Sequence, residues 1–197
     1  MSTSLMVGPD HWLTDARQCV SPNCDDRPTG EISLLVIHGI SLPPGQFGDG
    51  LVDQLFSNTL DCSRMPELAD LAGVKVSAHL LIDRAGAVNQ YVPFDKRAWH
   101  AGASCWRGRA SCNDFAIGIE LEGADDVPYE PAQYEVLVDV ADALFVRYSS
   151  LRLGSVVGHQ DIAPGRKSDP GASFDWSGFL TALNSRAQRR VSTAARH

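Results

Sequence analysis

The chain contains a run of apolar residues, from Ile32 to Ile37, that ends abruptly at His38. An apolar run of this length, with little polar alternation, is typical of a strand that is covered on both faces. An imidazole at the end of such a strand, where the chain opens into the loop 41–45, has a position at which active-site residues are common. From the residues alone, His38 is either a functional ligand or a core histidine bonded to a carbonyl group.

The periodicity of the rest of the chain predicts both strands and helices. Strands are expected at 74–82, 87–91 and 114–123, the first two of them paired as a hairpin. Helices are expected at 51–56, 66–71, 131–148 and from Asp175 onward. This order of elements predicts an α+β (mixed α/β) fold, a single domain with a central mixed β-sheet flanked by helices.

The two ends of the chain differ from this central part. Residues 1–30 are rich in Pro, Asp and Ser, and we expect them to pack on the domain as an extended lead-in. Residues 31–185 form the predicted domain, a length that suits one hydrophobic core. Residues 186–197 are basic, rich in small side chains and aperiodic, which predicts a disordered tail.

The charge and the cysteines limit the class of protein. The formal net charge of −7 argues against nucleic acid or an anionic membrane as the main partner. No apolar stretch approaches the length that spans a bilayer, and the first residues lack the basic start and apolar core of a signal peptide. The five cysteines are odd in number and scattered, as expected of reduced thiols. These features predict a cytoplasmic protein.

A loop rich in glycine and proline runs from Gly158 to Gly171. It contains three residues whose side chains can bind a metal or take part in catalysis: His159, Lys167 and Asp169. A histidine and an aspartate on one stiff loop are able to face the same cation. A catalytic zinc ion takes three protein ligands and leaves one position for water. The loop therefore needs a third ligand from elsewhere, and His38 is the best candidate.

The strand expected at 114–123 contains two acids, Glu120 and Glu122, on one face. Burying a carboxylate in an apolar strand is costly unless the group is paired or functional. We interpret Glu122 as part of a structural pair, and from the residues alone Glu120 is either paired or functional.

Five segments together resemble the AmpD-type amidases, the anhydro-N-acetylmuramoyl-L-alanine amidases of bacterial cell-wall recycling. They span residues 37–48, 76–79, 92–102, 112–123 and 157–176, in that order. The wider superfamily includes phage-type amidases and the peptidoglycan recognition proteins. The resemblance implies their fold, a mixed sheet flanked by helices.

The resemblance also implies roles for individual residues. The zinc ligands of the family fall on His38, His159 and Asp169, with one Zn²⁺ per chain. The acid/base glutamate falls on Glu120, and the catalytic lysine falls on Lys167. One position departs from the family, because Gly39 stands where an asparagine commonly follows the first histidine ligand.

Candidates for substrate contacts are weaker, since each has an ordinary structural interpretation. A packed tryptophan is nearly as good an explanation of Trp99 as a wall of the substrate cleft, and exposed cations are usually only solvated. The candidates are Trp99, His100, Lys75, Arg109 and Arg166. We interpret His79 as a structural histidine or a support for a ligand, and Asn113 as a turn cap.

The function expected from the resemblance is zinc-dependent hydrolysis of the amide between the lactyl group of (anhydro-)N-acetylmuramic acid and L-alanine. The expected partner is a small muropeptide, with no nucleic acid and no membrane, and the protein is expected to be a monomer. Loss of such an enzyme is expected to derepress a chromosomal β-lactamase in its host. The alternatives are an amidase acting on intact peptidoglycan and a non-catalytic peptidoglycan-binding module.

Overall fold

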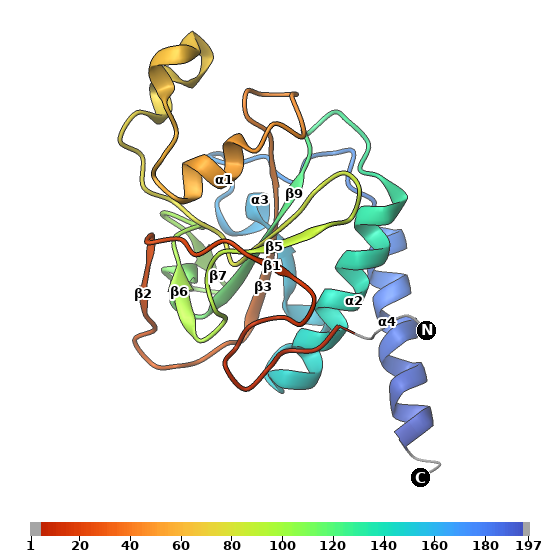
Figure 1. Cartoon of the computed structure of the whole chain (residues 1–197). Helices are drawn as coiled ribbons and strands as arrows, with labels where there is room; N and C mark the ends of the chain where they lie inside the picture. Colours follow the sequence, from red (N-terminus) through yellow and green to blue (C-terminus); the bar gives the residue numbers. More distant parts are fainter. Residues whose placement is uncertain (1–4, 195–197) are drawn as a thin grey trace.

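A six-stranded mixed sheet forms the centre of the computed structural model, which describes residues 5–194 (Figure 1). Its strand order is β1 (Arg17–Gln18), β5 (Val88–Gln90), β4 (Leu80–Ile82), β9 (Ala116–Glu122), β3 (Leu34–Ile40) and β10 (Val156–Gly158). Within this sheet, the β4–β5 hairpin is antiparallel and the other neighbours are parallel. The predicted central mixed sheet flanked by helices is confirmed.

One face of the sheet packs against two long helices, α2 (Pro131–Arg147) and α4 (Trp176–Ala194), which lie side by side (Figure 1). Pro131 at the first turn and a capping box between Glu130 and Gln133 begin α2. Alternate residues of β3 and β9 enter this core, because side chains along a strand point to opposite faces. They are Leu35, Ile37, Ile117, Ile119 and Leu121.

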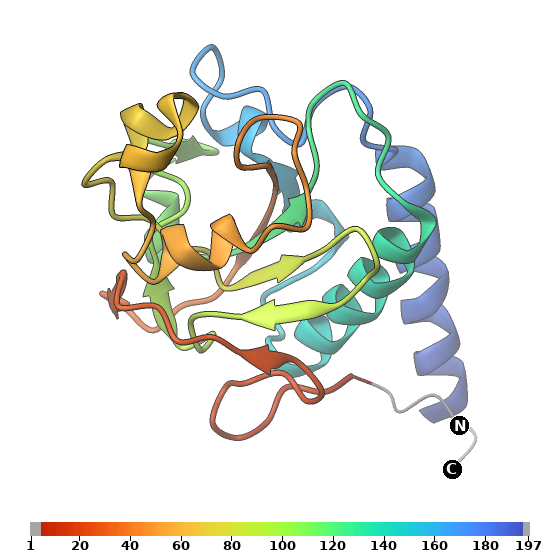
Figure 2. The same cartoon turned by 45° about the horizontal axis from the view of Figure 1, so that its top comes forward.

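The opposite face carries shorter elements. The helix α1 (Leu51–Phe56) and the 3₁₀ helix η2 (Pro66–Leu71) pack there against Leu81 and Tyr91, and they are the orange and gold helices at the left of Figure 2. The remaining short elements are η1 (Cys62–Arg64), η3 (Cys112–Asp114), η4 (Leu153–Ser155), α3 (His159–Ile162) and the two-stranded pairs β2 (Cys24–Asp26) with β6 (Lys96–Ala98) and β7 (Cys105–Trp106) with β8 (Arg109–Ala110). The side chains on this face of β3, β9 and β10 include His38 and Glu120, which are register partners.

Three local expectations differ from the structure. The strand expected at 74–82 is confined to β4, because the amide of Val74 bonds back to Leu71 O and keeps this segment with the preceding turn. The region expected to be a non-helical loop begins with the helical turn α3, whose Asp161 carboxylate accepts a hydrogen bond from the amide of Gly158 (2.7 Å). The lead-in contributes β1 to the sheet.

The C-terminal helix is longer than the sequence predicted. A disordered tail was expected from residue 186, whereas α4 continues to Ala194; residues 195–197 lie outside the described part. Arg186 and Arg190 on α4 pair with Asp139 and Asp142 on α2, with the contacts Arg186–Asp139 at 2.8 Å and Arg190–Asp142 at 2.5 Å. These ion pairs attach the C-terminal part of α4 to α2, although that part has little apolar periodicity of its own.

The five cysteines are free thiols, as expected. Within residues 5–194, no helix combines the length and the apolar character that crossing a bilayer requires.

Candidate metal centre

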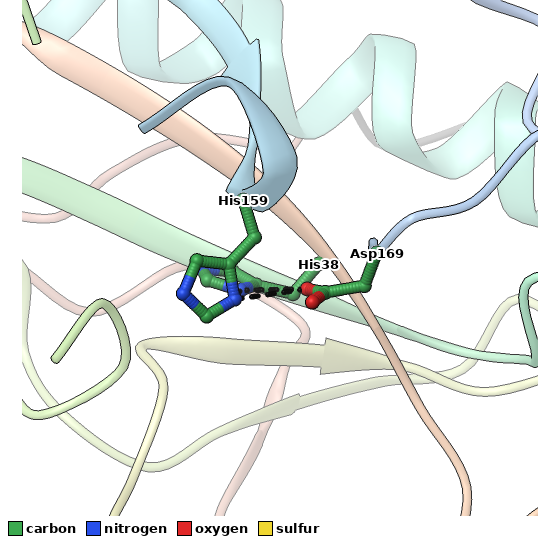
Figure 3. Close-up of side chains that lie close together, drawn as sticks. All are labelled: His38, His159 and Asp169. Atoms are coloured by element: carbon green, nitrogen blue, oxygen red, sulfur yellow. Dashed lines mark hydrogen bonds and ion pairs between the residues drawn. The ribbon is translucent and has the colours of Figure 1, made fainter. Parts of the chain in front are cut away.

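Three side chains from separate elements converge at the ends of the central strands (Figure 3). His38 comes from β3, His159 begins α3 directly after β10, and Asp169 lies in the loop that follows α3. The two Nδ1 atoms are 3.0 Å apart, and Asp169 Oδ2 lies 3.2 Å from Nδ1 of His38 and 3.1 Å from Nδ1 of His159. Ligand atoms around a tetrahedral zinc ion are about 3.3 Å apart, so the three residues predicted as ligands fit such an ion.

The protonation state of this group suits a cation. Burial lowers the pKa of His38 to about 4, so its imidazole is neutral at pH 7. Burial alone would raise the pKa of Asp169, but hydrogen bonds to His159 and His38 outweigh it and lower that pKa below its usual range. A neutral imidazole and a carboxylate are the forms in which these side chains bind metal.

Glu120 lies beside the metal-binding group because its strand pairs in parallel with β3, in the register that puts Glu120 opposite His38. The side chain is 8% exposed, and its Oε2 has no hydrogen-bond partner among the described residues. Burial, and then the charge of Asp169, raise the pKa of Glu120 well above its ordinary value, while Lys167 opposes the shift. A buried carboxyl group with a free oxygen next to a metal site is suited to accept and return a proton.

Lys167 is exposed in the loop between α3 and Asp169, and its amide bonds to Ala163 O (3.1 Å). Its charge acts on both His38 and Glu120, since it lowers the pKa of each. The lysine therefore lies within electrostatic reach of the site without being buried in it.

Of the predicted substrate contacts, two lie close to the metal-binding group. His100 is placed behind His38, with its Nδ1 2.9 Å from His38 Nε2. Burial and the neighbouring histidines hold the pKa of His100 well below its usual range. Arg166 donates hydrogen bonds to Ala101 O (2.6 Å) and Ala103 O (2.8 Å).

The other three predicted contacts have neighbours of their own. Trp99 is half-buried, and its indole bonds to Asp25, whose pKa is lowered chiefly by Arg97. Arg109 pairs with Glu31 (2.8 Å) and stacks over the ring of Phe115. Lys75 is exposed and borders a hollow beside Leu55 and Leu71. Their roles as substrate contacts stay predictions.

Tyr129 is a neighbour of the site that the sequence did not single out. Its buried hydroxyl donates to Pro170 O (2.9 Å), directly after the candidate ligand Asp169. A Cβ atom at Gly39 would lie 2.3 Å from this hydroxyl, so the phenol occupies the space that a side chain at position 39 would need. The sequence feature that could have indicated this neighbour is Gly39, because a glycine is unexpected at that position.

Comparison with known proteins gives consistent matches. The family model of N-acetylmuramoyl-L-alanine amidases matches residues 28–172. The chain is 52% identical over 187 residues to 1,6-anhydro-N-acetylmuramyl-L-alanine amidase AmpD of Enterobacter cloacae, which covers 94% of this chain and 100% of the relative. It is 53% identical over 174 residues to AmpD of Escherichia coli K12, with 88% of this chain and 94% of the relative covered.

Solved structures agree in fold. A selenomethionine AmpD crystal structure superposes with a TM-score of 0.87 at 51% identity, covering 90% of this chain and 99% of that one. A second is Escherichia coli AmiD in complex with anhydro-N-acetylmuramic acid-L-Ala-D-γ-Glu-L-Lys, with a TM-score of 0.57 at 31% identity, covering 91% of this chain and 65% of that one.

Proposed function

Because the chain belongs to the N-acetylmuramoyl-L-alanine amidase family, we propose that it hydrolyses the amide between the lactyl group of 1,6-anhydro-N-acetylmuramic acid and L-alanine. The observation that carries this proposal is the convergence of His38, His159 and Asp169 beside the unpartnered carboxyl oxygen of Glu120. The names of the relatives from Enterobacter cloacae and Escherichia coli support the choice of substrate.

We propose Zn²⁺, one ion per chain, as the metal that these three residues hold. Two imidazole nitrogens and one carboxylate oxygen are a donor set that zinc prefers, and three protein ligands are the number found in catalytic zinc sites. When bound, zinc supplies Lewis acidity, which activates water and polarises a carbonyl group at neutral pH.

Glu120 is the proton carrier in this proposal. As a carboxylate it accepts a proton from the attacking water while the new carbon–oxygen bond forms. It then returns that proton to the alanine nitrogen as the carbon–nitrogen bond breaks, so that the peptide leaves as an amine. Its raised pKa suits both steps, and such a general acid/base typically contributes about 10²–10⁴-fold in rate.

Lys167 stabilises the negative charge that develops on the carbonyl oxygen. Its side chain is exposed, and its charge acts on both His38 and Glu120. Removal of one such stabilising group typically costs about 10²–10³ in rate.

We propose a soluble muropeptide, handled in the cytoplasm by a monomeric enzyme, in preference to intact peptidoglycan. The relatives named for the anhydro compound align over nearly the whole chain, which supports this choice. A chromosomal β-lactamase in the host is then expected to be derepressed when the gene is lost.

Parallel assays test this choice. Purified protein is incubated with anhydro-muramyl-tripeptide and, separately, with polymeric sacculi, and released peptide is measured. Faster release from the soluble compound is expected. Release from sacculi alone would favour an amidase of intact peptidoglycan, and binding of either compound without release would favour a binding module.

A further inference from the structure

Both histidines of the candidate metal centre have their second ring nitrogen engaged by the same short segment, His100–Ala101. His38 Nε2 lies 2.9 Å from Nδ1 of His100, and His159 Nε2 lies 3.2 Å from Ala101 O. One segment thus contacts two ligands that are 121 residues apart in the chain.

These contacts suit the tautomer that each candidate ligand needs in order to bind metal through Nδ1. A carbonyl oxygen only accepts, so His159 must carry its proton on Nε2 to bond with Ala101 O. In that tautomer its Nδ1 carries no proton and is available to a metal ion shared with Asp169. Likewise, His38 keeps its Nδ1 free when its Nε2–H donates to Nδ1 of His100.

The ring of His100 is held in place by the strand beneath it. A Cβ atom at Gly118 would lie 2.5 Å from Cγ of His100, closer than real Cβ contacts allow. Gly118 stands on β9 two residues before Glu120, on the same face of the sheet. The glycine therefore makes the space in which the imidazole lies.

The two backbone amides of the segment are held by one side chain, that of Asn113. Its Oδ1 accepts hydrogen bonds from the amides of His100 (3.1 Å) and Ala101 (2.8 Å). This goes beyond the turn-capping role expected of Asn113, since the two amides belong to the residues that contact the two ligands.

We propose that His100 and Asn113 are positioning residues for the metal, acting through the histidines and not on the substrate. The segment holds the rings of both ligands in place and accommodates the Nε2-protonated tautomers that metal binding through Nδ1 requires. Groups that bond to the free nitrogen of a ligand histidine typically change metal affinity by about 10–100-fold when removed. The inference rests on the proposed function, because it takes His38, His159 and Asp169 to be the zinc ligands.

The test is zinc affinity, measured on the full-length chain by competition with a chromophoric chelator. His100→Leu removes the acceptor, whereas His100→Asn keeps an acceptor oxygen at the position of Nδ1. Asn113→Leu and Asn113→Asp form a second pair, since aspartate still accepts from both amides. Each leucine variant is expected to bind zinc about 10–100-fold more weakly than wild type, and each polar variant to recover most of the loss.

Thermal unfolding of the metal-free proteins shows whether each variant is folded. A further variant serves as the control. His11→Asn alters a histidine that bonds to the hydroxyl of Tyr148 (2.7 Å), and zinc affinity should be unchanged. Equal zinc affinity in wild type and in a folded leucine variant would overturn the proposal, as would equal weakening in both members of a pair. If one leucine variant does not fold, the other pair decides. Wild type that binds no zinc would instead refute the proposed function.

Discussion

Glu120 and His38 are register partners on the adjacent parallel strands β9 and β3. Parallel pairing in this register puts both side chains on the same face, at the same level of the sheet. The proposed proton carrier and one proposed ligand are therefore placed relative to each other by strand pairing, which is stiffer than loop packing. Only Asp169 depends on a loop, since His159 begins α3 directly after β10.

Replacement of Glu120 by glutamine should abolish proton transfer and leave the metal site intact. The amide has nearly the same shape but cannot accept and return a proton, so kcat should fall by about 10²–10⁴-fold. Zinc content and peptide release are measured on the same preparation. Glu122→Gln is the matched control, because Glu122 accepts from the amides of Gly48 and Arg84 and should affect kcat far less. Full activity in Glu120→Gln with zinc bound would refute the role.

The same variant should change how stability depends on pH in the metal-free protein. The folded pKa of Glu120 is raised, so above the unfolded pKa of about 4.5 the folded state retains a proton that the unfolded state has lost. Glu120 therefore destabilises the fold increasingly as the pH rises from about 4.5. The free energy of unfolding of Glu120→Gln should gain on that of wild type between pH 4.5 and pH 7. Denaturant titrations at both pH values that give the same difference would contradict the buried, unpaired state of this carboxyl group.

Lys167→Met should lower kcat by about 10²–10³-fold, since the ammonium group that stabilises the developing oxyanion is lost. Zinc affinity should change little, because Lys167 is exposed and is not one of the three converging groups. Lys167→Arg, which retains the charge, should keep more activity than Lys167→Met. Indistinguishable rates for wild type and Lys167→Met at saturating substrate would remove Lys167 from the mechanism.

Tyr129→Phe should weaken zinc binding by up to about tenfold, because Pro170 O loses its hydrogen bond and the adjacent Asp169 is held less firmly. Tyr134→Phe is the matched control. Its hydroxyl also bonds to this part of the chain, but as an acceptor, from the amide of Asp175 (2.8 Å), which is six positions beyond Asp169. Chelator competition should show a loss in the first variant alone, and equal losses in both would mean general loosening of the loop.

Much of the fold could be predicted because it depends on local periodicity. The apolar run ending at His38, the alternation before Glu120 and the three- and four-residue steps of α2 are visible in the sequence. The extension of α4 was missed because it depends on ion pairs between Arg186 or Arg190 and α2, which no pattern within the segment reveals. Tertiary contacts here outweigh local propensity.

The candidate site was likewise predictable from the sequence only in part. His159 and Asp169 were recognisable because they share a loop, and His38 because it ends an apolar run; the resemblance then implied that all three are ligands. The contacts of His100 with His38 and of Tyr129 with Pro170 join residues that are 62 and 41 positions apart. Gly118 and Gly39 mark where those rings lie, but a glycine in a sequence does not say which side chain fills its space.

Zinc content and cleavage of anhydro-muramyl-tripeptide, determined together for wild type and Asp169→Ala, test the central claim most directly. The account predicts about one zinc ion per chain and release of the peptide by wild type. Both should be lost in the variant, which lacks one of three ligands. Peptide release that continues in Asp169→Ala after its zinc is lost would contradict the account.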